Sequence, residues 1–266
     1  MSSNNNQQVR LVTWKNMFKL DPKTILDIGS SEGKWSDAAK NVFPNSRYFL
    51  VDGDDRFESE LSKKGYNHEI CVLYKEETEV EWHKAIAEGF VGGHLREEIT
   101  PFGMDPNNFE TVPTQTKLLP KVLEENDIEF DSVDLIRVDV QGSELDVLEP
   151  CKELLKNHKP VISMVVNVIE YNKGCPKLFE IMKFFDEVGY ELRDIIDLAS
   201  FRTNQGIFTI QFNALFCEKD KYDVCKIVME TMKNSRQVKE VNKTPQNNQP
   251  QGGGDIMDQI MGGLRY

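Results

Sequence analysis

"TILDIGSSEGKWSDAAK" (residues 24–40) joins a short apolar run, an acidic residue, a glycine-containing turn and a helix-forming segment. The β-branched and aliphatic residues at 24–28 predict a buried strand. After the turn, apolar side chains recur at the spacing of one helical face, namely Trp35, Ala38, Ala39 and Val42. Pro44 ends this helix, because proline cannot continue one. A strand, a glycine turn and a helix in this order are typical of a nucleotide-binding site.

The same alternation of strands and helices continues along the chain. We expect further strands at 47–51, 68–74, 133–140, 161–169 and 206–216, with 78–83 as a strand beside 68–74. We expect helices at 9–20, around Phe57 and Leu61, at 116–126, from a cap at Ser143 to about Leu155, and from Pro176 to Gly189. Residues 84–113 are expected to form a long loop. The pattern predicts an α/β, doubly wound, mostly parallel sheet.

Three regions are expected from composition. The polar residues 1–8 are expected to be disordered, and residues 9–232 to form one α/β domain. Residues 233–266 begin with a linker rich in Pro, Gln and Gly that cannot bury enough apolar surface to order itself. Within them, apolar residues at helical spacing in 253–266 predict a short amphipathic segment that could dock on a protein partner.

Charge and cysteine usage exclude several classes of function. The 266 residues carry a net charge of −12, and an acidic chain without a basic patch repels nucleic acid. The 5 cysteines form no C-x-x-C pair, which argues against a zinc knuckle or a disulfide framework and favours a reducing compartment. We find neither a signal peptide nor an apolar run of the roughly 20 residues that a membrane span needs. We therefore expect a cytoplasmic protein with no nucleic-acid or membrane partner.

The glycine turn fits one kind of nucleotide site better than two others. A phosphate-binding loop needs G-x-x-x-x-G-K-[ST], but Gly29 and Gly33 are one residue too close and Trp35 replaces the hydroxyl. A dinucleotide site needs G-x-G-x-x-G, but Ser31 stands where the second glycine is required. The remaining pattern is D-x-G-x-x-x-G, starting at Asp27, in which an acidic residue lies beside the turn.

An acidic turn suits a ligand that carries positive charge and no phosphate. S-adenosylmethionine has a sulfonium and an α-amino group, so Asp27 is compatible with it, and Gly29 lets the backbone turn close to the ligand. Asp52 ends the next strand, where its carboxylate could accept both ribose hydroxyls. A tight turn with a capping acid is the alternative interpretation.

A second acidic loop repeats this arrangement in "DLIRVDVQGSELDVL" (134–148). Ligands of doubly wound sheets lie beyond the carboxyl ends of the strands, where the strand order reverses. If the strands at 24–28 and 134–140 flank that point, Gly29 and Asp139 face one crevice. Asp139 and Glu144 could instead only stabilise the turn and the first turn of the helix that follows.

Five segments together resemble the FkbM-type S-adenosylmethionine-dependent methyltransferases over about residues 15–218. They are "ILDIGSSEGKWS" (25–36), "FLVDGDDRF" (49–57), "DLIRVDVQGSELDVLEP" (134–150), "EYNKGCPKLFEIMKFFDEVGYEL" (170–192) and "QFNALF" (211–216). The resemblance implies a class I methyltransferase fold, with a seven-stranded Rossmann-like sheet and one antiparallel strand. It implies O-methylation, often of a sugar or a glycosylated natural product, and thus a small-molecule or glycan acceptor. The implied cofactor-binding residues are Asp27, Gly29, Ser30, Ser31, Gly33, Asp52, Gly53 and Asp139.

Methylation of a sugar hydroxyl needs a group that removes the proton. The candidate bases are Asp139, at the expected methyl-transfer position, His94, in a loop that could fold over the acceptor, and Glu170, after the strand at 161–169. Glu170 could instead only hold the turn that follows it. A divalent metal such as Mg²⁺ is a further possibility, and Asp139, Glu144 and Glu170 would be its ligands.

Two other functions remain open at this point. The first is a binding protein with a methyltransferase fold and weak or no catalysis, recruited through its C-terminal segment. Acidic residues frequent in the family are absent here, with Asn213 in the position of one, and this favours that alternative. The second is a nicotinamide oxidoreductase, which would need the missing G-x-G-x-x-G pattern.

Overall fold

A computed structural model describes residues 3–87, 92–99, 105, 107–170, 172–203, 206–219 and 221. The chain divides into two compact units, Met1–Tyr222 and Asp223–Tyr266, and every described residue belongs to the first. The predicted linker and amphipathic segment at 233–266 lie outside the described residues. None of the described helices is long and apolar enough to cross a lipid bilayer.

A seven-stranded sheet forms the centre of the first unit, with strand order β3-β2-β1-β6-β7-β9-β8. Its strands are β1 (Thr24–Ile28), β2 (Arg47–Asp52), β3 (Asn67–Ile70), β6 (Val133–Val138), β7 (Val161–Asn167), β8 (Tyr190–Thr203) and β9 (Gly206–Glu218). Among these strands, β9 alone runs opposite to the other six, and it pairs antiparallel with both β7 and β8. This topology confirms the predicted doubly wound, mostly parallel sheet with one antiparallel strand.

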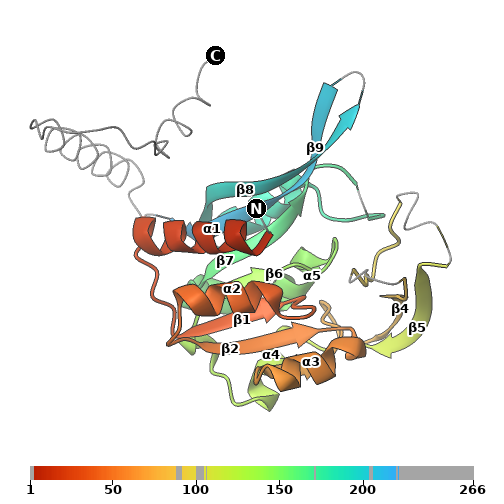
Figure 1. Ribbon diagram of the computed structural model, residues 1–266, viewed down its shortest axis with the longest axis horizontal. Helices are drawn as coiled ribbons and strands as arrows, with labels where there is room; N and C mark the ends of the chain where they lie inside the picture. The colour runs from red at the N-terminus through yellow and green to blue at the C-terminus, as the bar shows by residue number, and fades with distance from the viewer. Residues whose placement is uncertain are drawn as a thin grey trace, which may run out of the picture. The chain divides into compact units, whose positions relative to one another are not determined.

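Helices cover both faces of the sheet (Figure 1). On one face lie α1 (Ser3–Met17), α2 (Lys34–Val42) and α3 (Glu58–Lys63). On the other lie α4 (Leu119–Glu125), α5 (Glu144–Leu148), α6 (Lys152–His158) and α7 (Leu178–Glu187). Successive strand residues point to opposite faces, so Leu26 packs in one core and Ile25 in the other. Because both faces are covered, β1 is buried along its whole length.

Several sequence expectations were wrong in detail. Helix α1 begins at Ser3 and so includes residues 3–8, which the composition assigned to the polar N-terminal segment. The strand expected at 68–74 ends at Ile70, where its pairing partner β2 also ends, at Asp52. The expected strand beside it is instead β4 (Glu79–Ala85), which pairs with β5 (Phe109–Gln115) in a separate two-stranded sheet. Strand β5 falls partly inside the segment expected to be a loop.

The helix expected from Ser143 to Leu155 is divided into α5, a 3₁₀ turn at Glu149–Cys151 and α6. Pro150 lies in that turn, because proline has no amide proton for an α-helical hydrogen bond. The Ser143 side chain does not cap α5. The Glu144 carboxylate instead accepts hydrogen bonds from the amides of Val140 and Gly142, at 3.3 and 3.1 Å.

Candidate cofactor and acceptor site

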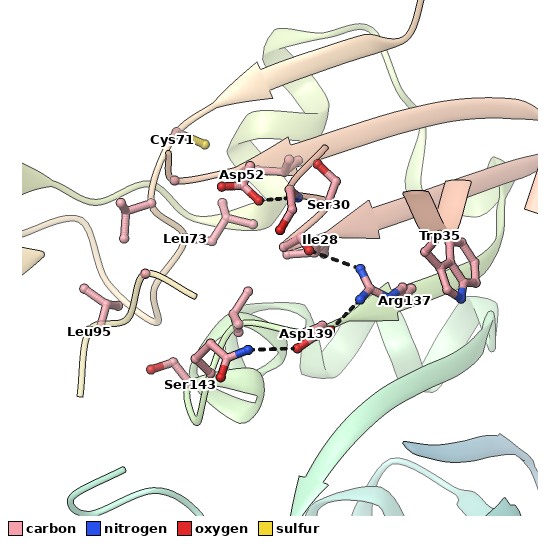
Figure 2. Close-up of a pocket in the computed structure, with 18 of the residues that line it drawn as sticks. Ile28, Ser30, Trp35, Asp52, Cys71, Leu73, Leu95, Arg137, Asp139 and Ser143 are labelled. Atoms are coloured by element: carbon pink, nitrogen blue, oxygen red, sulfur yellow. Dashed lines mark hydrogen bonds and ion pairs between the residues drawn. The ribbon is translucent and has the colours of Figure 1, made fainter. Parts of the chain in front are cut away.

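A cavity of about 250 Å³ lies where the strand order reverses, between β1 and β6. Figure 2 shows Cys71, Leu73 and Leu95 on one side of it, and Trp35 and Arg137 on the other. The turn after β1 and the turn after β6 meet here, as expected for a ligand site in a doubly wound sheet.

Gly29 brings these two turns into contact. Its φ is +78°, and a Cβ atom at this position would lie 1.9 Å from the carbonyl oxygen of Asp139. The amide of Asp139 also donates to the carbonyl of Ile28 at 2.9 Å. Any side chain at position 29 would push the Asp139 loop away from the first strand.

Asp52 is fixed by the backbone around it at the edge of the cavity. Its Oδ2 accepts from the amide of Ser31 at 2.6 Å, and its Oδ1 accepts from the amide of Asp54 at 2.9 Å. Burial raises the pKa of Asp52 to about 6, although these two amide hydrogen bonds oppose the shift. At neutral pH the side chain is therefore an oriented carboxylate with acceptor capacity remaining for a ligand.

A buried ion-pair network lies beneath the other end of the cavity. Arg137 on β6 donates from Nη1 to Asp27 Oδ1 at 2.7 Å and to the carbonyl of Gly29 at 3.1 Å, and from Nη2 to Asp139. Ser36 Oγ on α2 donates to the second Asp27 oxygen at 2.6 Å. Burial lowers the pKa of Arg137, but the two carboxylates outweigh burial and raise it. Asp27 is thus a structural counter-ion, and Asp139 is the carboxylate that faces the cavity.

The hairpin of β4 and β5 supplies an aromatic wall. Trp82 on β4 lines the cavity, and its indole fits against two glycines. A Cβ at Gly93 would lie 2.5 Å from its Cζ2 atom, and one at Gly53 would lie 3.0 Å away. The apolar residues Val72 and Leu73 complete this side of the cavity. Aromatic and apolar side chains therefore line the same cavity as the Asp52 carboxylate.

Residues 92–99 connect the aromatic wall around Trp82 to the segment 134–148. Arg96 donates to Asp146 Oδ2, with Nη2 at 2.6 Å, and to the carbonyl of Gly174 at 2.6 Å. Nδ2 of Asn172 donates to the carbonyl of Arg96 at 3.1 Å. These contacts hold Gly93 and Leu95 against the cavity.

The family model for the methyltransferase FkbM domain matches residues 27–192, more than half of the chain. The chain belongs to the FkbM methyltransferase family. The match includes both turns at the cavity and the whole of the Arg137 network. This result confirms the family expected from the sequence and the coarse function, S-adenosylmethionine-dependent methyl transfer.

Two solved structures illustrate what this FkbM methyltransferase is similar to. A S-adenosylmethionine-dependent methyltransferase from Clostridium acetobutylicum is 11% identical, with a TM-score of 0.46 over 82% of this chain and 92% of that chain. Precorrin-6y C5,15-methyltransferase from Geobacter metallireducens is 13% identical, with a TM-score of 0.44 over 82% and 91%. A comparison with curated proteins gave no match.

The cavity of this FkbM methyltransferase fits S-adenosylmethionine in its distribution of groups. Asp52 would accept the ribose hydroxyls, and the space beside Trp82 suits a flat nucleobase. The hydroxyls of Ser30 and Ser143, which both line the cavity, are buried and have no hydrogen-bond partner among the described residues. Buried polar groups are normally satisfied, so these two hydroxyls indicate a polar ligand.

Six of the predicted cofactor-binding residues line the cavity, namely Gly29, Ser30, Ser31, Asp52, Gly53 and Asp139. Two do not. Asp27 is completely buried in the ion-pair network. Gly33, at φ +74°, begins α2 and faces Leu61, with a Cβ position only 3.1 Å from that side chain. Both positions therefore support the turn without lining the cavity.

The structure does not bring His94 to the cavity. Its neighbours Gly93 and Leu95 line the cavity, and the His94 ring packs instead against Phe109 and His83, with ring centroids 4.6 and 5.1 Å away. Burial lowers the pKa of His94 to about 4, and His83 adds to the shift. The ring is therefore neutral at pH 7 and belongs to the packing of the hairpin.

The three carboxylates considered for a metal are also separate. Glu170 is exposed, and its carboxylate accepts a hydrogen bond from the amide of Gly174 at 2.6 Å. This contact agrees with the alternative interpretation, in which Glu170 only holds the turn that follows it. Glu144 is buried against the backbone of its own loop. Among the residues that the structure describes, no group of three or more His, Cys, Asp or Glu could hold a metal ion. The predicted Asp139, Glu144 and Glu170 metal site is thus not supported.

Sequence reasoning missed Arg137. A signal was present, because an arginine stands among the apolar residues of the expected strand "VDLIRV" (133–138). Buried charges need partners, and Asp27 lies directly opposite in the β1–β6 register. Pairing the two strands in the correct register would have predicted the ion pair.

Proposed function

We propose that this FkbM methyltransferase methylates oxygen, and that its acceptor is a hydroxyl of a sugar or glycan. The observation that carries the proposal is the meeting of Asp52, Gly29 and Asp139 in one cavity at the point where strand order reverses. A carboxylate held in a fixed orientation at the methyl-transfer end is what a weakly acidic hydroxyl requires.

Each residue has a distinct task in this proposal. Asp52 accepts the ribose hydroxyls, and Gly29 lets the β1 turn approach the ligand closely. When bound, S-adenosylmethionine supplies a methyl group already activated on a sulfonium, so the protein mainly aligns the reacting groups. Asp139 takes the proton of the acceptor hydroxyl on the carboxylate that Arg137 holds in place. General-base assistance of this kind contributes roughly 10²- to 10⁴-fold to rate.

Calorimetry followed by a transfer assay tests the proposal. The full-length protein should bind S-adenosylhomocysteine, and Asp52→Ala should weaken binding strongly. With S-adenosylmethionine and a panel of methyl glycosides, Asp139→Asn should reduce kcat by roughly 10²-fold at saturating S-adenosylmethionine. Absence of binding at millimolar ligand, or methyl transfer to amines and thiols but never to hydroxyls, would refute it.

A further inference from the structure

A second, smaller hollow of about 80 Å³ continues from the cofactor cavity beneath α1. The two spaces share four lining residues, namely Gln7, Trp35, Arg137 and Asp139. We call this second space the side compartment. It therefore adjoins the proposed base, Asp139, whereas Asp52 lines only the cofactor cavity, and it has room for several water molecules.

The floor of the side compartment is the sheet itself. Ser163 on β7 lies beside Arg137 in the β6–β7 register, and Asn213 on β9 lies opposite Ile196 of β8. Helix α1 forms the roof, and Trp14 holds it there because its Nε1 donates to Asp194 Oδ2 at 2.8 Å. The compartment is thus lined from rigid elements, which position polar side chains more accurately than loops do.

A break in β8 directs one more carboxylate into the side compartment. The register of β8 against β9 shifts between Ile196 and Ala199, and Asp197 within this shift has φ +51°. Such a conformation is unfavourable for a residue with a side chain, and bulges of this kind re-aim side chains beside active sites. Asp197 lines the compartment as a result.

Polar side chains gather here without protein partners. Five of them make no side-chain hydrogen bond or ion pair to another described residue: Gln7, Arg10, Ser163, Asp197 and Asn213. Ser163 is only 4% exposed, and the Oε1 atom of Gln7 is buried. Arg10 and Asp197 are exposed and Gln7 and Asn213 are half-buried, so the rule that buried polar groups are paired applies here to the Oε1 atom of Gln7, which is buried without a partner among the described residues. That unpaired atom, in a lining of mixed polar groups, indicates a polar ligand.

We propose that the side compartment is the acceptor subsite, and that it binds adjacent hydroxyls of a sugar ring whose next hydroxyl is presented to Asp139. The inference rests on the proposed function and adds the position of the acceptor. Carboxylate and guanidinium groups lie together with amide and hydroxyl groups, so donors and acceptors are mixed. Hydroxyls both donate and accept and match such a mixture, whereas an anion needs only donors and an amine only acceptors. The indoles of Trp14 and Trp35 offer apolar surface to the ring.

The test uses the full chain saturated with S-adenosylhomocysteine and a panel of methyl glycosides, each paired with its deoxy analogues. Saturation-transfer NMR and calorimetry should detect glycoside binding that weakens when either of two adjacent hydroxyls is removed. Asp197→Asn and Ser163→Ala should each raise the glycoside Kd roughly tenfold. Both variants should keep the Kd for S-adenosylhomocysteine within about twofold.

Asp127→Asn is the matched control, because Asp127 is exposed and also has a positive φ of 53°, but does not line the compartment. It should change neither Kd. Glycoside affinity that is unaffected in the two test variants, no glycoside binding at all, or a loss of S-adenosylhomocysteine affinity in those variants would each overturn the inference. If the wild type fails to bind S-adenosylhomocysteine, it is instead the proposed function that fails.

Discussion

At the scale of single residues, Asp52 is the side chain whose charge should control cofactor affinity. Asp52→Asn keeps an oxygen for the amide of Ser31 but removes the charge that strengthens hydrogen bonds to ribose hydroxyls. We expect the Kd for S-adenosylhomocysteine to rise roughly 10- to 100-fold by calorimetry.

Because the pKa of Asp52 in the free protein is about 6, wild-type affinity for S-adenosylhomocysteine should fall as pH decreases below 6. The variant should lack this pH dependence, and Asp55→Asn, at a neighbouring exposed carboxylate, should behave as wild type.

Glu144 is a second residue whose ionisation should be measurable, through the pH dependence of the free energy of unfolding. Burial raises its pKa to about 7, from 4.5 in an unfolded chain. Between those values the folded state binds more protons than the unfolded state, so its contribution to the free energy of unfolding is present below pH 4.5 and is lost as pH rises through 7. The loss is roughly 3 kcal/mol.

Urea unfolding of wild type and Glu144→Gln at several pH values between 4 and 8 checks this expectation. Glutamine retains an acceptor for the amides of Val140 and Gly142, so the loop keeps its hydrogen bonds. The stability difference between the two proteins should change across this range, whereas the exposed Glu153→Gln should give a constant difference. Parallel pH profiles for wild type and Glu144→Gln would contradict the shifted ionisation.

At the scale of elements, the contact between the β1 turn and the β6 turn determines the site. Gly29→Ala should destabilise the fold by roughly 3 kcal/mol in urea unfolding, because its Cβ would overlap the Asp139 carbonyl at 1.9 Å. Gly65→Ala is the control, since Gly65 also has a positive φ of 73° but nothing lies within 4 Å of its Cβ position. That variant should lose only about 1 kcal/mol. Equal losses would show that the close approach is unimportant.

Elements with strong local patterns were predictable, and those defined by distant partners were not. Residues 24–28 form β1 with the predicted bounds, because a short β-branched run between turn residues specifies a buried strand. Strand β8 was missed because its alternating charged residues, such as Glu191 and Arg193, resemble a loop until β9 covers one side. The partner of β4 was wrong because its pairing with β5 depends on tertiary contacts.

The residues of the candidate site were likewise predictable where a local sequence pattern marks them, and not where tertiary contacts bring them to the cavity. Asp52 is the last residue of β2 and Asp139 directly follows β6, and strand ends can be predicted from the sequence. Trp82 and Gln7 reach the cavity from a hairpin and from an N-terminal helix, and neither position carries a local signal of binding. His94 was predicted at the site from its residue type, but the side-chain alternation along an extended segment turns it away.

At the scale of the whole molecule, the fold and both cavities belong to one unit. The sheet, its covering helices and every lining residue lie within Met1–Tyr222. Removal of Asp223–Tyr266 should therefore change the Tm by less than about 2 °C, because none of the buried core residues identified in the structure is lost. Calorimetric affinity for S-adenosylhomocysteine should stay within about twofold. The contrasting variant is a chain truncated after Leu215, which loses the last part of β9 with the buried residues Phe216 and Cys217. This variant should not fold. If the shorter deletion also lowered the Tm by several degrees, residues beyond Tyr222 would have to contribute directly to the stability of the methyltransferase unit.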